Sequence, residues 1–260
     1  MSQVVAARRK PARPAIGSDR SIFWLSVLSA QVPSDDRWLS DWERQRLDGF
    51  GSLQRQRDFR LGRWTAKQAL KYWRTASPET VPWGTFEMHN DDHGRPIAIA
   101  DGTVLDLPIS ISHRQGRALC VLAPRVGLVG CDIETVEVHS ASFVHDHLTA
   151  LEKETVDRSS LAPNQAITVL WSAKEAVYKA QDQVVPIVAS DIDIGFGPED
   201  PVDGWRTFRA QIGRLGGRQH QGWWRLIGSW VLTVITDLPT VAPVDLVRPR
   251  SRPEAIGSTL

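Results

Sequence analysis

The sequence has little cysteine and no long apolar run. Its 260 residues include two cysteines, Cys120 and Cys131, which cannot build a Cys-rich metal cluster or a disulfide framework. So few cysteines fit a reducing compartment. No apolar run approaches the roughly 20 residues that a bilayer span needs. The apolar stretch 22–28 is short and follows Asp19 and Arg20, so we interpret it as a buried first strand, not a signal peptide. We therefore expect a cytoplasmic protein with no membrane partner.

The sequence also has no excess of positive or negative charge. The chain has 31 lysines and arginines against 30 acidic residues, and the formal net charge is +1. Proteins that bind nucleic acid or anionic membranes usually show a surplus of positive charge. We therefore expect no nucleic-acid partner, although a local basic patch is compatible with this balance.

A mixed pattern of helices and strands lies between two tails. Residues 1–19 are rich in Arg, Lys, Pro and Ala without periodicity, which predicts a disordered tail, and residues 243–260 have a similar character. Periodicity and turn residues predict helices at 39–48, 53–75, 149–158 and 164–181, strands at 21–30, 126–134, 190–196 and 223–236, and a hairpin at 107–122. This alternation favours a mixed α/β or α+β fold over a helical bundle.

One seven-residue pattern occurs twice. Residues 64–70 read WTAKQAL and residues 171–177 read WSAKEAV, and both lie on expected helices. The similarity is either chance or the trace of two related halves packed about a pseudo-twofold axis. In the second case the halves differ in chemistry, because Glu175 stands where the first copy has Gln68.

Two acidic residues follow an apolar strand at 130–134, GCDIE. Alternate residues of a strand share a face, so Asp132 and Glu134 point one way while Cys131 and Ile133 point into a core. Two adjacent carboxylates repel each other unless a cation lies between them. Magnesium suits the pair, because it takes hard oxygen ligands and bridges carboxylates to phosphates. The alternative is a strand that emerges into solvent with two surface acids.

A further carboxylate and a cation lie on the second of the repeated helices. Glu175 and Lys179 are four residues apart, so they share a helix face. They form either an exposed ion pair of small energetic value or part of a site. In the second interpretation Glu175 completes the metal site and the Lys179 ammonium binds a phosphate oxygen.

Positive charge gathers on the expected helix at 53–75. The basic residues that crowd it include Arg55, Arg57, Arg60, Arg63, Lys67 and Lys71. Arg60, Arg63 and Lys67 share a face, which is either solvated or a clamp for a multiply charged small anion. His113, after Ser112 at the end of a hairpin strand, is either structural or a donor to a phosphate.

Together these pieces resemble the 4′-phosphopantetheinyl transferase superfamily, in particular its Sfp-like members. That family is marked by a Gly-x-Asp-x-Glu strand, found here at 130–134, and a Trp-x-x-Lys-Glu-x-x-x-Lys helix, found here at 171–179. Three smaller elements of the family are also present, namely Leu61-Gly62-Arg63, Gly94-Arg95-Pro96 and Ile111-Ser112-His113. The likeness runs from about residue 21 to about residue 236.

The resemblance implies an architecture. We expect two similar α/β halves, residues 20–124 and 125–240, with coenzyme A in the cleft between them and flexible tails at 1–19 and 241–260. A chain with two halves needs no second copy to complete the site, so we expect a monomer.

The resemblance also implies a site and a reaction. A serine of an apo acyl or peptidyl carrier protein attacks the β-phosphorus of coenzyme A, and 3′,5′-ADP leaves. Asp132, Glu134 and Glu175 are expected to hold Mg²⁺, and Glu152 to act as general base. The residues expected to contact coenzyme A are Arg57, Arg63, Arg95, Pro96, Ser112, His113 and Lys179, of which His113 and Lys179 would touch the pyrophosphate and act in catalysis.

Two other functions are compatible with the same acidic residues. A metal-dependent nuclease would use Asp132, Glu134, Glu175 and Lys179, but it would need a continuous basic track for the nucleic-acid backbone. A non-catalytic homologue that only binds carrier protein or coenzyme A would not need three metal carboxylates. The sequence does not identify the carrier, which could serve fatty-acid, polyketide or nonribosomal-peptide synthesis.

Overall fold

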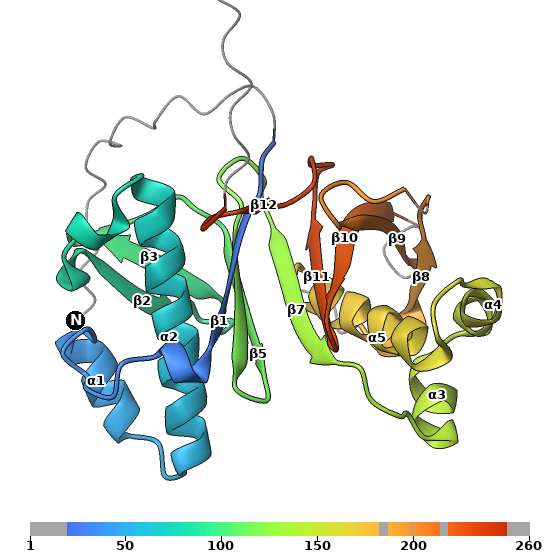
Figure 1. Ribbon diagram of the computed structural model, residues 1–260, viewed down its shortest axis with the longest axis horizontal. Helices are drawn as coiled ribbons and strands as arrows, with labels where there is room; N and C mark the ends of the chain where they lie inside the picture. The colour runs from blue at the N-terminus through green and yellow to red at the C-terminus, as the bar shows by residue number, and fades with distance from the viewer. Residues whose placement is uncertain (1–19, 182–186, 199, 214–217, 249–260) are drawn as a thin grey trace, which may run out of the picture.

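The protein has two β-sheets in the middle and helices on the outside (Figure 1). This computed structural model describes residues 20–181, 187–198, 200–213 and 218–248. Its α-helices are α1 (Asp41–Asp48), α2 (Leu53–Arg74), α3 (Ala141–His147), α4 (Ala150–Arg158) and α5 (Pro163–Lys179). Short 3₁₀ helices are η1 (Ser29–Gln31), η2 (Pro78–Thr80), η3 (Trp83–Thr85) and η4 (Ala189–Asp191). In the part of the chain described, no helix is both long and apolar enough to cross a membrane.

The strands form two large sheets and one small one. They are β1 (Phe23–Leu28), β2 (Phe86–Asn90), β3 (Pro96–Ala100), β4 (Thr103–Val104), β5 (Ile109–Arg114), β6 (Arg117–Leu122), β7 (Val129–Thr135), β8 (Ile192–Phe196), β9 (Arg206–Ile212), β10 (Arg218–Ile227), β11 (Trp230–Thr236) and β12 (Val244–Asp245). The first sheet has the order β12-β1-β6-β5, the second β7-β11-β10-β9-β8, and the small one β2-β3-β4. The predicted mixed α+β class is confirmed.

The two large sheets meet along β5 and β7, which lie at adjoining edges. The Cys131 N–H on β7 donates to the Ser110 hydroxyl on β5 at 2.9 Å. Helix α2 packs on the first sheet and α5 on the second, so each sheet has one helix-covered face and one face toward the other sheet (Figure 1). Residues that belong to the two halves in sequence are therefore brought together at the β5–β7 seam.

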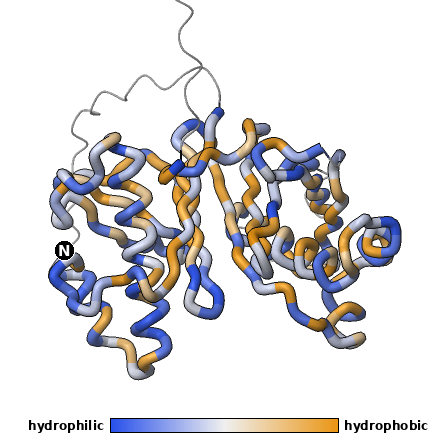
Figure 2. The backbone as a smooth tube through the Cα atoms, in the orientation of Figure 1, coloured by the Kyte–Doolittle hydropathy of each residue, from blue (hydrophilic) through white to orange (hydrophobic). Residues whose placement is uncertain are grey.

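Three apolar cores hold these layers together. One lies between α2 and the first sheet and includes Leu70 and Met88, and one lies between α5 and the second sheet and includes Val177. The third lies between the sheets and includes Cys131 and Ile133, as the alternation of the acidic strand predicts. Figure 2 shows the apolar positions gathered along the central strands.

Two predictions about the end of the chain are wrong. The strand predicted at 223–236 is two strands, β10 and β11, because Gly228 adopts a φ of 61° and reverses the chain. The flexible tail predicted from residue 241 does not begin there. Strand β12 pairs in parallel with β1, and Leu246 is buried. The predicted tail at 1–19 and the end of the chain from 249 lie outside the described residues. Strands β2–β4, strand β9 and helix α3 were not predicted from the sequence.

Helix α5 approaches strand β7 so closely that only glycine fits at position 130. A Cβ atom on Gly130 would lie 1.9 Å from the carbonyl oxygen of Ala176 and 2.7 Å from the amide nitrogen of Ala180. Both contacts are backbone atoms, which cannot swing away as a side chain could. The glycine of the acidic strand thus lets the helix that bears Glu175 and Lys179 lie directly on the strand that bears Asp132.

We expect Gly130→Ala to destabilise the fold by about 3 kcal/mol, the upper end of overpacking costs, because the helix and strand must separate. Urea denaturation monitored by circular dichroism measures this loss. The matched control is Gly195→Ala on β8, where an added Cβ meets nothing within 4 Å and the change should stay within about 0.5 kcal/mol. Equal stability of the two variants would show that the contact at Gly130 is not tight.

Candidate functional site

The Asp132 carboxylate receives donors from two elements that meet at β7. It is almost fully buried. Its Oδ1 accepts from the Ser112 hydroxyl on β5 at 2.8 Å and from the Lys179 ammonium on α5 at 2.7 Å. Its Oδ2 accepts from the Ser172 hydroxyl at 2.9 Å. Since Ser112 belongs to the first half and α5 to the second, this one carboxylate links the halves.

The Glu134 carboxylate lies on the same face of β7, two residues further on, and it faces Arg114. The Arg114 Nε atom lies 3.1 Å from Oε2 of Glu134, and the Arg114 Nη2 atom lies 3.2 Å from Oε1 of Glu137. Burial and the nearby Asp132 charge raise the pKa of Glu134 to about 7, against the lowering effect of Arg114. Burial is thus the main reason that Glu134 holds its proton more tightly than a solvated carboxyl group does.

Glu175 and Lys179 extend the cluster along α5. Burial and the Asp132 charge raise the pKa of Glu175. Burial alone would lower the pKa of the Lys179 ammonium, but Asp132 and other nearby groups raise it above its usual value. Lys179 also donates to Ser112 at 2.9 Å. The predicted helix-face pair therefore lies in a partly enclosed site, since about a third of the Lys179 side chain is exposed.

A cavity of about 560 Å³ opens beside these residues. Its charged lining comes from Arg114, Glu134, Glu137 and Glu175, and its aromatic lining from Phe143, Trp171 and His139. Carboxylates and flat apolar rings therefore face the same space.

The three predicted metal ligands lie near one another but do not form a finished metal site. Within the described ranges, no three His, Cys, Asp or Glu side chains converge as a ready-made metal centre. Asp132 is occupied by serine and lysine donors and Glu134 by Arg114. The donor chemistry still suits Mg²⁺, which takes hard oxygen ligands, and burial together with the nearby Asp132 charge raises the pKa of both Glu134 and Glu175.

Of the residues predicted to bind coenzyme A, the structure brings Ser112 and Lys179 into this cluster. His113 is nearly half exposed, with its Nδ1 atom 3.8 Å from Asp58. Arg63 is buried, donates to Asn90 at 2.7 Å, and has its pKa lowered to about 10 by burial.

Three further residues predicted for coenzyme A lie on α2 and at the start of β3. Arg95 pairs with Asp91 at 2.8 Å, Pro96 begins β3, and Arg57 is exposed near the start of α2. Their roles in binding coenzyme A remain predictions.

The predicted general base, Glu152, occupies a closed position instead. Its side chain is fully buried, and its Oε2 lies 2.7 Å from the Lys174 ammonium. It also accepts from the Thr149 N–H at 2.8 Å, as the third residue of a capping box, and from the Ile194 N–H at 2.9 Å. Lys174 donates further to two backbone carbonyls. From these contacts we propose that Glu152 is a structural partner of Lys174 and not the proton acceptor.

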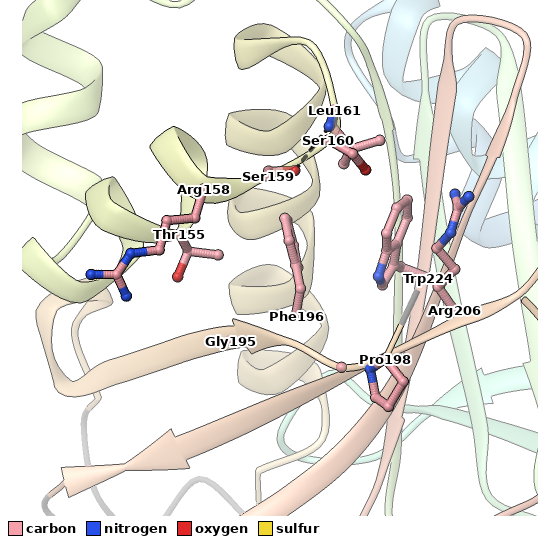
Figure 3. A pocket seen from close by; sticks show the side chains of 11 residues that line it. Thr155, Arg158, Ser159, Ser160, Leu161, Gly195, Phe196, Pro198, Arg206 and Trp224 are labelled. Carbon is pink, nitrogen blue, oxygen red and sulfur yellow. Dashed lines mark hydrogen bonds between the residues drawn. The ribbon is translucent and has the colours of Figure 1, made fainter. Parts of the chain in front are cut away.

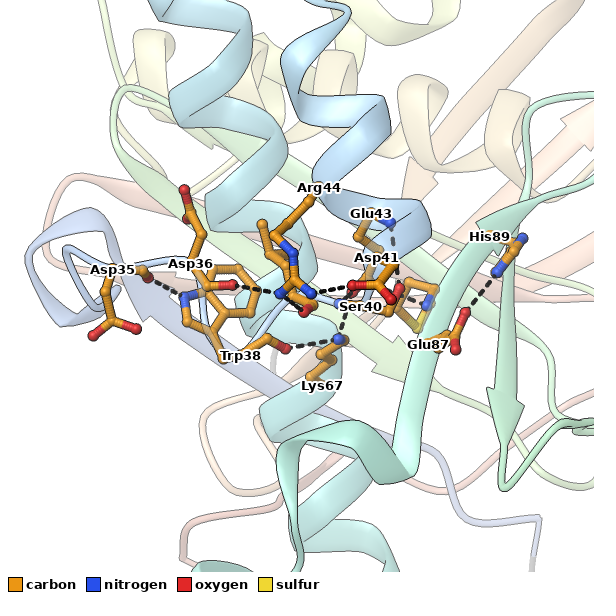
Figure 4. A network of polar contacts seen from close by, with 12 residues as sticks. Asp35, Asp36, Trp38, Ser40, Asp41, Glu43, Arg44, Lys67, Glu87 and His89 are labelled. Carbon is orange, nitrogen blue, oxygen red and sulfur yellow. Dashed lines mark hydrogen bonds and ion pairs between the residues drawn. The ribbon is translucent and has the colours of Figure 1, made fainter.

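The first half contains a matching ion pair, which is drawn in Figure 4. Lys67 contacts Glu43, and both side chains are buried. Glu43 is the third residue of a capping box at Ser40 and accepts from the Met88 N–H at 3.0 Å, while Lys67 donates to the Trp38 carbonyl at 2.9 Å. The repeated Trp-Thr/Ser-Ala-Lys segments thus lie in matching environments, and the pseudo-twofold rotation between them remains a prediction.

Neither alternative for the shared face of α2, a solvated face or an anion clamp, describes Lys67 and Arg60. Lys67 is buried in the ion pair with Glu43, and Arg60 pairs with Asp36 at 3.1 Å. The face points inward, and these two cations find their partners in α1 or just before it.

Two residues of the cluster were missed from sequence although signals for them existed. Arg114 stands two positions after Ser112 on β5 and so shares its face. Ser172 stands three positions before Glu175 on the same face of α5. His139 was also missed. Its Nε2 lies 2.8 Å from the Thr168 hydroxyl, and nothing in the loop sequence indicates this contact.

We expect Glu152→Gln to lower the free energy of unfolding by about 3–5 kcal/mol, because Lys174 would be left as an uncompensated buried cation. Urea denaturation measures the loss. Glu43→Gln, the matching change in the first half, should cost a similar amount. A Glu152→Gln protein as stable as wild type, with turnover reduced by about 10²-fold or more, would restore the role of proton acceptor.

Two comparisons with known proteins point to the same family. The family model for the 4′-phosphopantetheinyl transferase superfamily matches residues 128–226. The holo-[acyl-carrier-protein] synthase of Geobacillus sp. (strain WCH70) is 33% identical over 85 residues, which cover 32% of this chain and 71% of that protein. The matched stretch of the family model contains the acidic strand, the Lys174–Glu152 pair and the helix that bears Glu175 and Lys179.

Proposed function

The chain belongs to the 4′-phosphopantetheinyl transferase superfamily, and from this membership we propose that it transfers the phosphopantetheine arm of coenzyme A to a serine of an acyl or peptidyl carrier protein. The observation that carries the proposal is the Asp132 cluster. It places three carboxylates and the Lys179 ammonium together beside a cavity of about 560 Å³. Such a site suits a pyrophosphate that is bound with a divalent cation.

We propose that Asp132, Glu134 and Glu175 hold Mg²⁺. When bound, the ion would neutralise charge on the pyrophosphate as the β-phosphorus–oxygen bond to 3′,5′-ADP breaks. Glu134 would then exchange its contact with Arg114, 3.1 Å away, for the ion. Arg114 would become available to a phosphate oxygen in the same cavity.

Lys179 and Ser112 would orient the donor. The ammonium already lies at the seam of the two halves, held by Asp132 and Ser112. It would donate to a pyrophosphate oxygen, and its raised pKa keeps it charged at neutral pH. The aromatic side chains of Phe143 and Trp171 line the cavity and would contact the apolar parts of the pantetheine arm.

We propose that the attacking serine does not use Glu152 as its general base. Positioning and charge stabilisation then supply most of the catalysis. This agrees with the placement of Glu152 in a buried ion pair.

The direct test incubates the protein with coenzyme A, Mg²⁺ and a panel of apo carrier proteins, followed by intact-mass spectrometry. We expect one phosphopantetheine to be added to a carrier serine. Asp132→Asn should lower the rate by about 10²-fold or more, as expected for loss of a key electrostatic group, while Glu154→Gln on the exposed face of α4 should not change it. No modification of any carrier by folded wild-type protein would refute the proposal.

Lys179→Met should weaken coenzyme A binding and also slow turnover, because the ammonium would stabilise charge present before the reaction and charge that grows during it. Loss of a charge-assisted hydrogen bond of about 1.5–3 kcal/mol predicts a fall of roughly 10- to 160-fold in kcat/KM.

Steady-state kinetics with saturating carrier measure this change, and thermal unfolding checks that the variant is folded. Lys153→Met, on α4, is the control and should behave as wild type. An unchanged KM for coenzyme A in the Lys179 variant would place that lysine outside the donor site.

A further inference from the structure

One arginine, Arg114, lines the cavity beside the Asp132 cluster. It is the last residue of β5 and so belongs to the first half of the chain. The carboxylates that share the cavity with it all come from the second half, and they are Glu134, Glu137 and Glu175. Among the described lining residues no other is a lysine or an arginine. A cation that enters this cavity therefore meets the guanidinium of Arg114 together with the carboxylates.

The contact between Arg114 and Glu134 is short but not directional. The Nε atom of Arg114 lies 3.1 Å from Oε2 of Glu134, yet its N–H makes no hydrogen bond with a described residue. The Arg114 side chain is 41% exposed, so water screens the attraction between the two charges. Charge attraction without a hydrogen bond thus holds this contact, and a divalent cation could replace the guanidinium at small cost.

The neighbouring contacts are held by hydrogen bonds. Lys179 donates to Asp132 at 2.7 Å and to Ser112 at 2.9 Å. The Nη2 group of Arg114 donates to Oε1 of Glu137 at 3.2 Å. Of the two cations at the site, Arg114 is therefore the one that can leave its carboxylate on β7, and Glu137 would keep it at the cavity wall when it does.

From these contacts we propose that Arg114 regulates the loading of the site, because it keeps metal affinity low until coenzyme A is present. This inference rests on the proposed transferase function and concerns the same site. In the metal-free protein the guanidinium occupies Glu134 and repels an incoming divalent cation. A guanidinium has five N–H donors, so Arg114 can keep its hydrogen bond to Glu137 and turn the edge released by Glu134 toward a phosphate of coenzyme A.

Arg114 would thus have opposite effects on two ligands. It opposes the metal ion when that ion binds alone, and it supports coenzyme A once the metal ion is bound. In thermodynamic terms the residue adds a favourable coupling between the two ligands, and such a coupling is reciprocal. Metal and coenzyme A would therefore load together, and the carboxylates would seldom hold the metal ion alone.

The first experiment measures metal binding to the full chain without coenzyme A. The probe is Mn²⁺, which takes the same hard oxygen ligands as Mg²⁺ and whose free ion is counted by electron paramagnetic resonance. We expect Arg114→Met to bind Mn²⁺ about 5-fold more tightly than wild type, because the change frees Glu134 and removes a repelling charge. Arg114→Lys keeps the charge, so its affinity should stay within about 2-fold of wild type.

The second experiment measures coenzyme A binding by calorimetry at saturating Mn²⁺. Arg114→Met should weaken this binding by about 10-fold or more, because a charge-assisted hydrogen bond to a phosphate is lost. The two affinities of one variant should therefore move in opposite directions. A residue that only supports the fold would lower both affinities or change neither.

Arg158→Gln is the charge-matched control. Arg158 forms an exposed ion pair with Glu154 at 3.0 Å. It lines a separate cavity of about 270 Å³ between α4 and β8, which shares no lining residue with the first (Figure 3). Both affinities of this control should equal those of wild type. Thermal unfolding checks that each variant is folded, and Arg114→Gln is judged by the same criteria if Arg114→Met does not fold.

Three results would overturn the proposal. They are Mn²⁺ binding by folded Arg114→Met that is no tighter than in wild type, equal tightening in Arg114→Lys or Arg158→Gln, and unchanged coenzyme A binding by Arg114→Met at saturating Mn²⁺. If wild type binds no coenzyme A, the transferase proposal fails and the Mn²⁺ measurement alone decides the role of Arg114. If wild type binds coenzyme A but modifies no carrier, both affinities still test Arg114, so the two failures are distinguishable.

Discussion

The structure of the site depends on one buried carboxylate, Asp132. Burial of a charge is costly unless partners compensate for it, and here the compensation comes from a strand of the first half and a helix of the second. The same contacts that neutralise Asp132 therefore fix β5, β7 and α5 relative to one another. A cation bound at this place would compete with Lys179 for the Asp132 oxygen atoms. Cation binding would therefore alter the contacts that hold the two halves together.

The two buried lysine–glutamate pairs show how a repeated scaffold can support different chemistry. Each pair ties a long helix to a capping box, to a backbone carbonyl and to a strand N–H. Next to the lysine, the first half has Gln68 and the second has Glu175. The helix of the second half thus brings a carboxylate to the cavity at the position where the helix of the first half has a neutral amide.

Local rules predicted much of this arrangement. Strand alternation placed Asp132 and Glu134 on one face, and helical spacing placed Glu175 beside Lys179. What these rules do not encode is which face is buried and what lies against it. Lys67 and Glu152 were misread for this reason, since their partners Glu43 and Lys174 are 24 and 22 positions away in the sequence.

The misread hairpin has a different cause. Gly228-Ser229 between two apolar runs is a turn signal, but the high β-propensity on both sides hid it. Strand β12 could not be predicted from its two residues, because its formation depends on a partner, β1, more than 200 positions earlier.

The pairing of β12 with β1 affects how the chain folds while it is being synthesised. Strand β1 is among the first described segments to leave the ribosome, and β12, which covers its outer edge, is made only after the whole second half. Until then β1 presents an unpaired edge, a surface prone to join other chains. Leu246, which belongs to the core under α2, is equally absent during that interval. The first sheet is thus completed only when β12, which follows the second half in the sequence, has been made. Chaperones that shield exposed strand edges would therefore be most useful to this chain during translation.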